Sequence, residues 1–296
     1  MPLRLCFALV LALASCNGAQ SEPISERPHQ DSESLDLPIL FGSDQDVWRM
    51  SNDGLIAQAI SETDALELNP EWSADGEQVV FERLPNPDAA SEYDIYRMDA
   101  DGTDVQLVAD VADREFNPSW SPDGEWIVFQ VEKREQLDLF VVRPDGSDLK
   151  RLTKSPSSES NPQWSPDGRL IAFTCTGRKS NICLMRADGS RRRKITSGPG
   201  SSTVASWSPS GKRLVFGYYP PHDGLPRLRI ISKDGSGLQP VGRRSDQFPI
   251  WGPDGSIMFH TVGTDGVPQG IWVMKPDGTA RKQIRTTGIA TDWLED

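Results

Sequence analysis

The segment Trp120-Ser-Pro-Asp-Gly124, followed by the apolar run Trp126-Ile-Val-Phe129, decides the fold because close variants of it recur along the chain. The other copies begin at Trp72, Trp164, Trp207 and Trp251, and a further Trp, Trp293, stands near the end. Successive Trp residues are 42 to 48 residues apart. A repeat of this length, with a Trp and Gly-containing tight turns, is typical of a β-propeller, in which each repeat is one small antiparallel sheet.

The repeat around Trp120 can be divided into four short strands. We expect these strands at Asn117–Trp120, Glu125–Phe129, Asp138–Val142 and Leu149–Thr153. Tight Asp-Gly turns follow the first strand and the third. Gly permits a positive φ at the last turn position, and the Asp side chain can cap the turn. We therefore interpret the repeated Asp-Gly pairs as structural.

The two ends of the chain supply the parts of one further repeat. Expected strands at Leu37–Phe41, Asp46–Met50 and Leu55–Ile60 have no Trp strand before them, whereas Ile289–Trp293 is a Trp strand with nothing after it. If the last strand pairs with the first segment, the ring closes and its edge strands disappear. The predicted fold class is all-β: a six-bladed β-propeller over residues 38–296, closed by pairing of its N-terminal strands with its C-terminal strand.

Composition narrows the class of function. The chain has 296 residues, of which 36% are hydrophobic and 25% charged, as in an ordinary globular protein. Its formal net charge of −12 argues against nucleic-acid binding, because phosphate neutralisation needs a basic face. We expect a monomer with no nucleic-acid partner.

The N-terminal segment reads as a targeting signal. Arg4 precedes an apolar run that is too short to span a bilayer, and the run ends in Leu13-Ala-Ser-Cys16, which resembles a bacterial lipobox. That resemblance implies a signal peptide over residues 1–15 and a lipid on Cys16. Asn17 is not the Asp that signals inner-membrane retention, so an outer-membrane lipoprotein facing the periplasm or the cell surface is implied. A plain secretory signal with a chance Cys is the alternative. Residues 16–37 are expected to form a flexible acidic tether.

Two cysteines, Cys175 and Cys183, lie in one repeat of the expected propeller. Facing residues of neighbouring antiparallel strands are about 4.5 to 5.5 Å apart at Cα, which a disulfide tolerates. Both a structural disulfide and a pair of packed thiols remain open from the sequence. Metal binding by this pair is not expected, because no His or third Cys stands nearby.

The full repeat pattern resembles that of TolB-type six-bladed propellers over residues 38–296. The resemblance rests on Asn-Pro-x-Trp-Ser-Pro-Asp-Gly, an apolar strand ending in Phe, Ile-Tyr-x-Met with Asp-Gly, and Leu-Thr. Similar propellers serve as periplasmic adaptors, as sugar-lyase domains and as gating domains of serine peptidases. The peptidase interpretation lacks a Gly-x-Ser-x-Gly motif, and the lyase interpretation needs several metal-binding His, whereas only His222 and His260 lie in the propeller.

The rim opposite the tight turns is the expected binding face, because its connections vary in length and chemistry. Four of the six positions that lie five residues before a blade Trp are acidic: Glu67, Glu115, Glu159 and Asp246, with Ser202 and Gly288 at the other two. Sixfold geometry would gather these carboxylates around one mouth of the central channel, where they would favour a basic peptide or a divalent cation. The alternative is that each carboxylate caps a turn or pairs with a neighbouring Arg.

Other candidate residues give weaker signals. His222 lies beside Tyr218, Tyr219 and two prolines on a long loop, where it could contact a peptide or glycan or only fill the loop. We expect His260 to be a structural imidazole. The run Arg191–Lys194 leads into an outer strand, where charges discourage edge pairing and could also contact a partner.

Two functional hypotheses follow. The preferred one is a lipid-anchored binding or scaffold propeller of the cell envelope that engages a protein or peptide through its variable rim and channel mouth. It needs no cofactor beyond a divalent cation that the acidic mouth could hold. The alternative is a metal-assisted hydrolase or lyase acting on carbohydrate, with the metal at that mouth.

Overall fold

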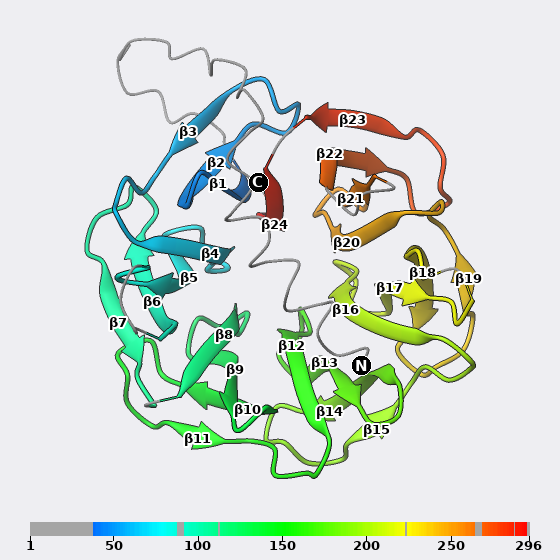
Figure 1. Ribbon diagram of the computed structural model, residues 1–296, viewed down its shortest axis with the longest axis horizontal. Helices are drawn as coiled ribbons and strands as arrows, with labels where there is room; N and C mark the ends of the chain where they lie inside the picture. The colour runs from blue at the N-terminus through cyan, green and yellow to red at the C-terminus, as the bar shows by residue number, and fades with distance from the viewer. Residues whose placement is uncertain are drawn as a thin grey trace.

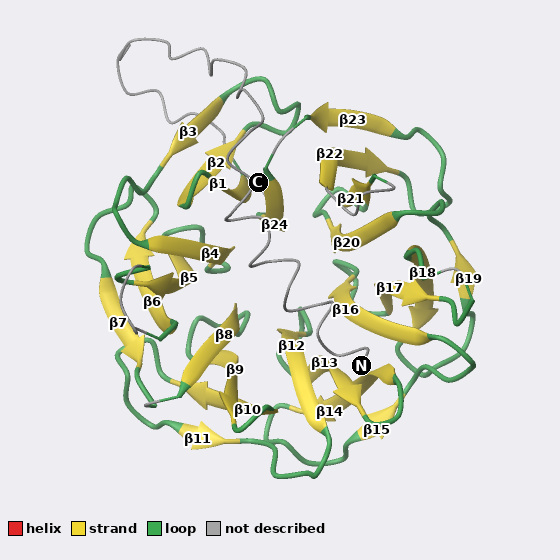
Figure 2. Ribbon diagram, viewed as in Figure 1, coloured by secondary structure: helices red, strands yellow, loops and turns green. Residues whose placement is uncertain are grey.

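The six-bladed β-propeller is confirmed. The computed structural model describes residues 38–87, 92–111, 113–222, 224–263, 268–286 and 288–294. Every regular element in these residues is a β-strand, and 24 strands form six four-stranded antiparallel sheets around a central axis (Figures 1 and 2). No helix in this described part is long and apolar enough to cross a membrane.

The six sheets are numbered here as blades 1 to 6 along the chain. Blade 1 combines both ends of the propeller: β24 (Ile289–Trp293), β1 (Ile39–Ser43), β2 (Asp46–Met50) and β3 (Ala57–Ala59). Blade 2 contains β4 (Leu66–Trp72), β5 (Gln78–Leu84), β6 (Asp94–Asp99) and β7 (Gln106–Ala109). Blade 3 contains β8 (Arg114–Trp120), β9 (Ile127–Lys133), β10 (Gln136–Val142) and β11 (Lys150–Arg151).

The second half of the ring repeats this pattern. Blade 4 contains β12 (Ser158–Trp164), β13 (Leu170–Thr176), β14 (Ser180–Arg186) and β15 (Arg193–Lys194). Blade 5 contains β16 (Ser201–Trp207), β17 (Arg213–Tyr219), β18 (Arg227–Ser232) and β19 (Gln239–Pro240). Blade 6 contains β20 (Asp246–Trp251), β21 (Ile257–Val262), β22 (Pro268–Met274) and β23 (Lys282–Arg285).

In the repeat around Trp120 the innermost strand is longer than predicted and the outermost one is shorter, whereas the predicted strand Ile289–Trp293 has the expected bounds. β8 begins at Arg114 rather than Asn117, because the strand continues through a bulge: Phe116 faces Gln130, and Ser119 faces Val128. Asn117 occupies the bulge with φ of 50°, a conformation that Asn tolerates well. β11 retains only two residues of the expected fourth strand.

In blades 2 to 4, a Ser and an Asp hold the turn after the innermost strand. Ser165 Oγ donates to Asp167 Oδ1 at 2.6 Å and accepts the amide of Leu170 at 2.9 Å. This hydrogen bond from Ser165 lowers the pKa of Asp167. Gly168 completes the turn at φ of 67°. The Ser73 and Ser121 turns have the same hydrogen bonds, so the Asp-Gly pairs are structural, as expected from the sequence.

The hydrophobic core lies between neighbouring blades. Each blade contributes one Phe that is at most 1% exposed: Phe41, Phe81, Phe129, Phe173, Phe216 and Phe259. Phe81, for example, packs in one cluster with Trp72 of its own blade and with Leu40 and Val47 of blade 1. Because each blade covers its neighbour, no blade can bury its faces alone.

Ring closure is also confirmed. β24 pairs with β1 through Ile39 opposite Trp293 and Phe41 opposite Ala290, so the two ends share one sheet (Figure 1). The amide of Leu294 donates to the carbonyl oxygen of Pro38 at 3.0 Å. Thr291 Oγ1 donates to the carbonyl oxygen of Pro70 at 2.7 Å, which ties β24 to blade 2 as well.

The ring has two unlike faces. One face carries the connections between the first and second strands and between the third and fourth strands of each blade. We call it the turn face. The opposite face, the variable rim, carries the connections between strands two and three and the crossovers between blades. Its connections between strands range from two residues, Arg134 and Glu135, to residues 85–93. Because β1 starts at the β24 end that bears Trp293, Pro38 lies on the turn face.

Candidate functional site

The four predicted carboxylates lie where the innermost strands begin, but they are inside the protein. Glu67, Glu115, Glu159 and Asp246 are at most 1% exposed. Burial raises the pKa of Glu67, and it raises the pKa of Glu115 to about 7. Ser202, at the fifth equivalent position, is buried as well.

Each of these carboxylates has partners within the protein. Glu115 accepts the amides of Val111 at 2.7 Å and Ile95 at 3.2 Å, and thereby links blade 3 to blade 2. Asp246 accepts hydrogen bonds from both terminal guanidinium nitrogens of Arg281, at 2.7 and 2.8 Å. These contacts match the alternative in which each carboxylate caps a turn or pairs with a cation.

The other two carboxylates follow the same pattern. Glu159 pairs with Arg192 at 2.6 Å and accepts a hydrogen bond from Ser155 Oγ at 2.5 Å. Glu67 lies 3.5 Å from Arg83 Nε. Ligand binding by the four carboxylates stays a prediction, and any ligand there would have to reach them past the loops of the variable rim.

A cavity of about 200 Å³ lies instead at the turn-face end of the channel. Its wall is built from the blade Trp residues, the turns that follow them and the residues that precede them. Four of the preceding side chains are polar and differ from blade to blade: Glu71, Gln163, Ser206 and Asp292. These residues were not predicted as site residues, although aligning the repeats on their Trp shows a polar residue directly before it in five of the six copies.

The side chains before the Trp residues connect the blades around the channel. Glu71 Oε1 accepts the amide of Trp120 at 2.8 Å, and Asp292 Oδ2 accepts the amide of Trp72 at 2.7 Å. Burial raises the pKa of Asp292 to about 6. Burial and the neighbouring charge of Asp292 raise the pKa of Glu71 well above its usual range. One of these two carboxyl groups with raised pKa values, Asp292, therefore lies in the strand that closes the ring, and the other, Glu71, lies in the neighbouring blade.

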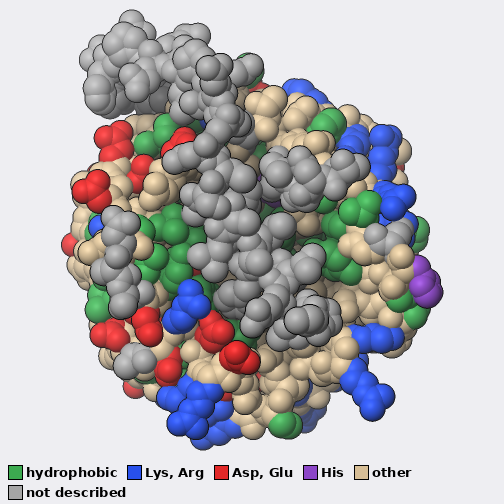
Figure 3. Space-filling view, viewed as in Figure 1, with side chains coloured by type: hydrophobic (Ala, Val, Ile, Leu, Met, Phe, Trp, Pro, Cys, Tyr) green, Lys and Arg blue, Asp and Glu red, His purple; other side chains and the backbone are tan. Residues whose placement is uncertain are grey.

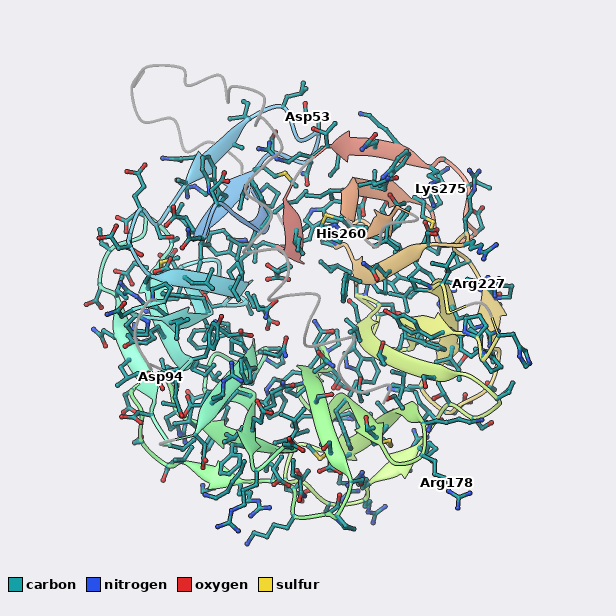
Figure 4. The ribbon with its side chains drawn as sticks, in the orientation of Figure 1. Asp53, Asp94, Arg178, Arg227, His260 and Lys275 are labelled. Carbon is teal, nitrogen blue, oxygen red and sulfur yellow. A yellow bond between two sulfur atoms is a disulfide. The ribbon has the colours of Figure 1, made fainter. Side chains whose placement is uncertain are left out.

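A second set of polar side chains connects the blades further along the channel. Glu82 Oε1 accepts the amide of the bulge residue Asn117 at 2.6 Å, and Gln130 Oε1 accepts the amide of Asn161 at 2.8 Å. Burial raises the pKa of Glu82 to about 7. Burial lowers the pKa of His260 to about 4, so this imidazole is neutral at physiological pH. It lies near the centre of the ring, with Nε2 3.3 Å from the carbonyl oxygen of Ala290 (Figure 4).

Metal-ligating side chains do not gather anywhere in the described residues. No group of three or more His, Cys, Asp or Glu side chains there could hold a metal ion. The buried carboxylates of the channel bind backbone amides of neighbouring blades instead. In this arrangement the carboxylates accept hydrogen bonds that connect neighbouring blades.

Cys175 and Cys183 form a disulfide with a Cα separation of 5.8 Å. The strand register differs from the expected facing pair. Cys175 faces Asn181 and Cys183 faces Phe173, so the two cysteines are diagonal neighbours on one face of the β13–β14 hairpin. Diagonal neighbours in an antiparallel pair share a face, which permits this bridge.

The weaker candidates of the sequence, His222 and the basic run 191–194, have different surroundings. His222 is exposed on the β17–β18 loop of the variable rim. In the basic run 191–194, Arg192 pairs with Glu159, and Arg193 donates to the carbonyl oxygen of Lys233 in blade 5. These two cations therefore stabilise the propeller itself.

Acidic and basic side chains are unevenly distributed on the variable rim. Glu92, Asp94, Asp110 and Asp113 lie together on the rim connections of blades 2 and 3. Burial and the charges of Asp110 and Glu92 raise the pKa of Asp94 to about 6. Exposed cations lie on the rim of blades 4 to 6: Arg178, Lys179, Arg243 and Arg244. Figure 3 shows Asp and Glu mainly on the left, over blades 1 to 3, with Lys and Arg also present there, notably near β11, whereas Lys and Arg are the charged side chains on the right; Figure 4 places Asp94 and Arg227 on opposite sides.

Comparisons with known proteins agree with this architecture. Three similar solved structures show the same fold. A putative TolB from Agrobacterium tumefaciens is 20% identical with a TM-score of 0.68, over 80% of this chain and 88% of that chain. TolB from Acinetobacter baumannii is 15% identical with a TM-score of 0.72, over 86% of this chain and 65% of that chain. A chain in a nidogen–laminin complex is 13% identical with a TM-score of 0.67, over 83% of this chain and 91% of that chain.

Sequence comparison identifies the family more directly than these structural similarities do. A comparison with curated protein sequences finds no match. The family model for the TolB β-propeller domain matches residues 42–216, which is more than half of the chain. The chain therefore belongs to the TolB β-propeller domain family.

Proposed function

We propose that the protein is a lipid-anchored binding module of the cell envelope whose variable rim engages a protein or peptide partner. The observation that carries this proposal is the contrast between the two faces. The turn face repeats the same short turns, whereas the rim has connections of unequal length and carries an acidic cluster on blades 2 and 3 and exposed cations on blades 4 to 6. Binding residues are commonly placed on variable loops that a rigid scaffold holds in position.

The charges of the rim suggest the chemistry of the partner. Glu92, Asp94 and Asp110 repel one another, and a Lys or Arg from a partner would relieve that repulsion. The exposed cations of blades 4 to 6 would receive an acidic segment of the same partner. Complementary charges at two separated places fix the orientation of a complex and speed its formation.

The envelope location is proposed on two grounds. The lipobox-like Leu13-Ala-Ser-Cys16 fits an outer-membrane lipoprotein, with residues 1–15 removed and residues 16–37 as the tether. Membership of the TolB β-propeller domain family fits an envelope protein. The fold is also found in a nidogen–laminin complex, where a propeller of this shape takes part in an assembly of proteins.

Affinity capture from envelope extracts tests this proposal. The wild-type protein is compared with the rim variant Glu92→Gln/Asp94→Asn and with the matched turn-face variant Glu77→Gln/Asp148→Asn, which removes the same number of charges. We expect a specific protein that the wild type and the turn-face variant capture at low salt, and that the rim variant captures at least fivefold less. Raising the salt to about 0.5 M should reduce capture, because it screens exposed charges. Equal capture by the two variants would contradict rim binding.

A further inference from the structure

The chain enters the propeller on the turn face. The carbonyl oxygen of Pro38 accepts hydrogen bonds from Leu294 N and from Trp72 Nε1, both at 3.0 Å. Trp72 lines the cavity at the turn-face end of the channel. Any tether that precedes residue 38 therefore starts near the centre of this face.

Exposed aliphatic side chains lie around the perimeter of the same face. In the described residues, six large hydrophobic side chains are exposed: Leu55, Ile56, Val105, Leu107, Leu149 and Leu238. All but Leu107 lie in or directly after the turn that leads into the outermost strand of a blade, and Leu107 is on the same outer edge in β7. Leu55 is 82% exposed, and its neighbour Ile56 is 46% exposed.

An aromatic and cationic group occurs at this perimeter as well. Arg143 and Lys150 lie over the ring of Trp126, with their charged atoms 4.3 and 4.8 Å from its centroid. Leu149 directly precedes Lys150. Trp, Lys and Leu side chains on one surface are typical of proteins that lie at the headgroup level of a bilayer.

We infer that the turn face is the surface that rests on the phospholipid headgroups, while the variable rim points away from the membrane. This inference rests on the lipid anchor of the proposed function. A flexible segment of the length of residues 17–37 has a root-mean-square span of about 25 Å, which keeps the propeller close to the lipid on Cys16. A tether that starts at the centre of the turn face brings that face to the membrane, and the aliphatic perimeter then contacts the headgroup layer.

This orientation explains why the two faces differ. The turn face carries cations as well as the capping Asp residues of its turns, so apolar contact rather than net charge would hold it to the membrane. The rim with its unequal loops remains accessible to a partner. The inference therefore predicts contact with lipids that is insensitive to salt, in contrast with salt-sensitive partner binding at the rim.

Fluorescence quenching in proteoliposomes tests the orientation. The full-length protein is produced with its own signal sequence, and the lipid on Cys16 is verified by mass spectrometry. Single substitutions Leu55→Cys and Leu238→Cys on the turn face, and Arg178→Cys and His222→Cys on the rim, receive a thiol-reactive fluorophore. The vesicles contain phosphatidylethanolamine and phosphatidylglycerol at a ratio of 3:1, with a spin-labelled headgroup lipid as the quencher.

The expected result is quenching at least threefold stronger at residues 55 and 238 than at residues 178 and 222, with little change at 0.5 M salt. Equal quenching at the four sites, or stronger quenching at the rim, on a protein that carries its lipid would overturn the orientation and leave the anchor intact. A full-length protein without lipid on Cys16 would overturn the anchor and the orientation together. As a second measurement, Leu149→Ser/Leu238→Ser should weaken quenching of a label at residue 55.

Discussion

Truncating the chain after residue 288 removes β24 and should open the ring. The deletion eliminates four paired positions between β24 and β1, the Leu294–Pro38 hydrogen bond, and the bonds of Thr291 and Asp292 to blade 2. Counting about four ladder bonds and three others at about 1 kcal/mol each gives a loss of about 7 kcal/mol. That loss is comparable to the whole stability of a typical domain, about 5–15 kcal/mol.

Thermal unfolding followed by circular dichroism measures this effect. At about 2 °C or more per kcal/mol for a protein of this size, the truncated chain should melt at least about 10 °C below the full chain, or fail to fold. A chain that ends at Leu294 is the control, because it retains β24 and should melt like the wild type. A truncated protein within about 2 °C of this control would refute the reasoning that β24 closes the ring.

Three further predictions concern the channel and the bulges. The folded-state pKa values of Asp292 and Glu71 are raised, so ionisation of these carboxyl groups destabilises the fold progressively as pH rises from about 4 through about 6 and beyond. The stability of Asp292→Asn relative to the wild type should therefore increase from pH 4 to pH 8 by about 1 kcal/mol or more. Urea denaturation of both proteins at both pH values measures this change. Glu82→Ala should lower the free energy of unfolding by about 2–4 kcal/mol at pH 6, because it leaves the amide of Asn117 and Asn69 Nδ2 without their acceptor. Glu82→Gln should cost less than half as much. Equal losses for the two variants would disprove the role of Glu82 as a hydrogen-bond acceptor. Val204 occupies the bulge position at φ of 49°, where blades 2, 3 and 4 have Asn, so Val204→Asn should raise stability by about 1 kcal/mol, and a lower melting temperature would contradict the assignment of strain.

The architecture could be predicted because its signals are local and repeated. The Trp spacing, the Asp-Gly turns and the split repeat at the two ends each depend on residues close in sequence. Together they determine six blades and their closure. Equivalent positions in a repeat must also occupy equivalent places in the ring, which is why Glu67 and Glu115 both lie near the start of an innermost strand.

The direction in which those side chains point could not be predicted. The bulge at Asn117 inserts one residue between Glu115 and Trp120, and one inserted residue changes which face of a strand a side chain occupies. Glu115 therefore lies between blades 2 and 3, while the residues directly before the Trp, such as Glu71, line the cavity. The disulfide shows the same limit, since its diagonal register depends on how β13 and β14 pair.

Site-specific photo-crosslinking in producing cells tests most directly whether the variable rim is the binding surface. A photoreactive phenylalanine analogue is placed at Glu92 or Arg178 on the rim and, for comparison, at Glu77 or Lys212 on the turn face, all of which are exposed. We expect that both rim positions form adducts with the same envelope protein and that neither turn-face position does. Protein adducts formed only from the turn face would contradict it.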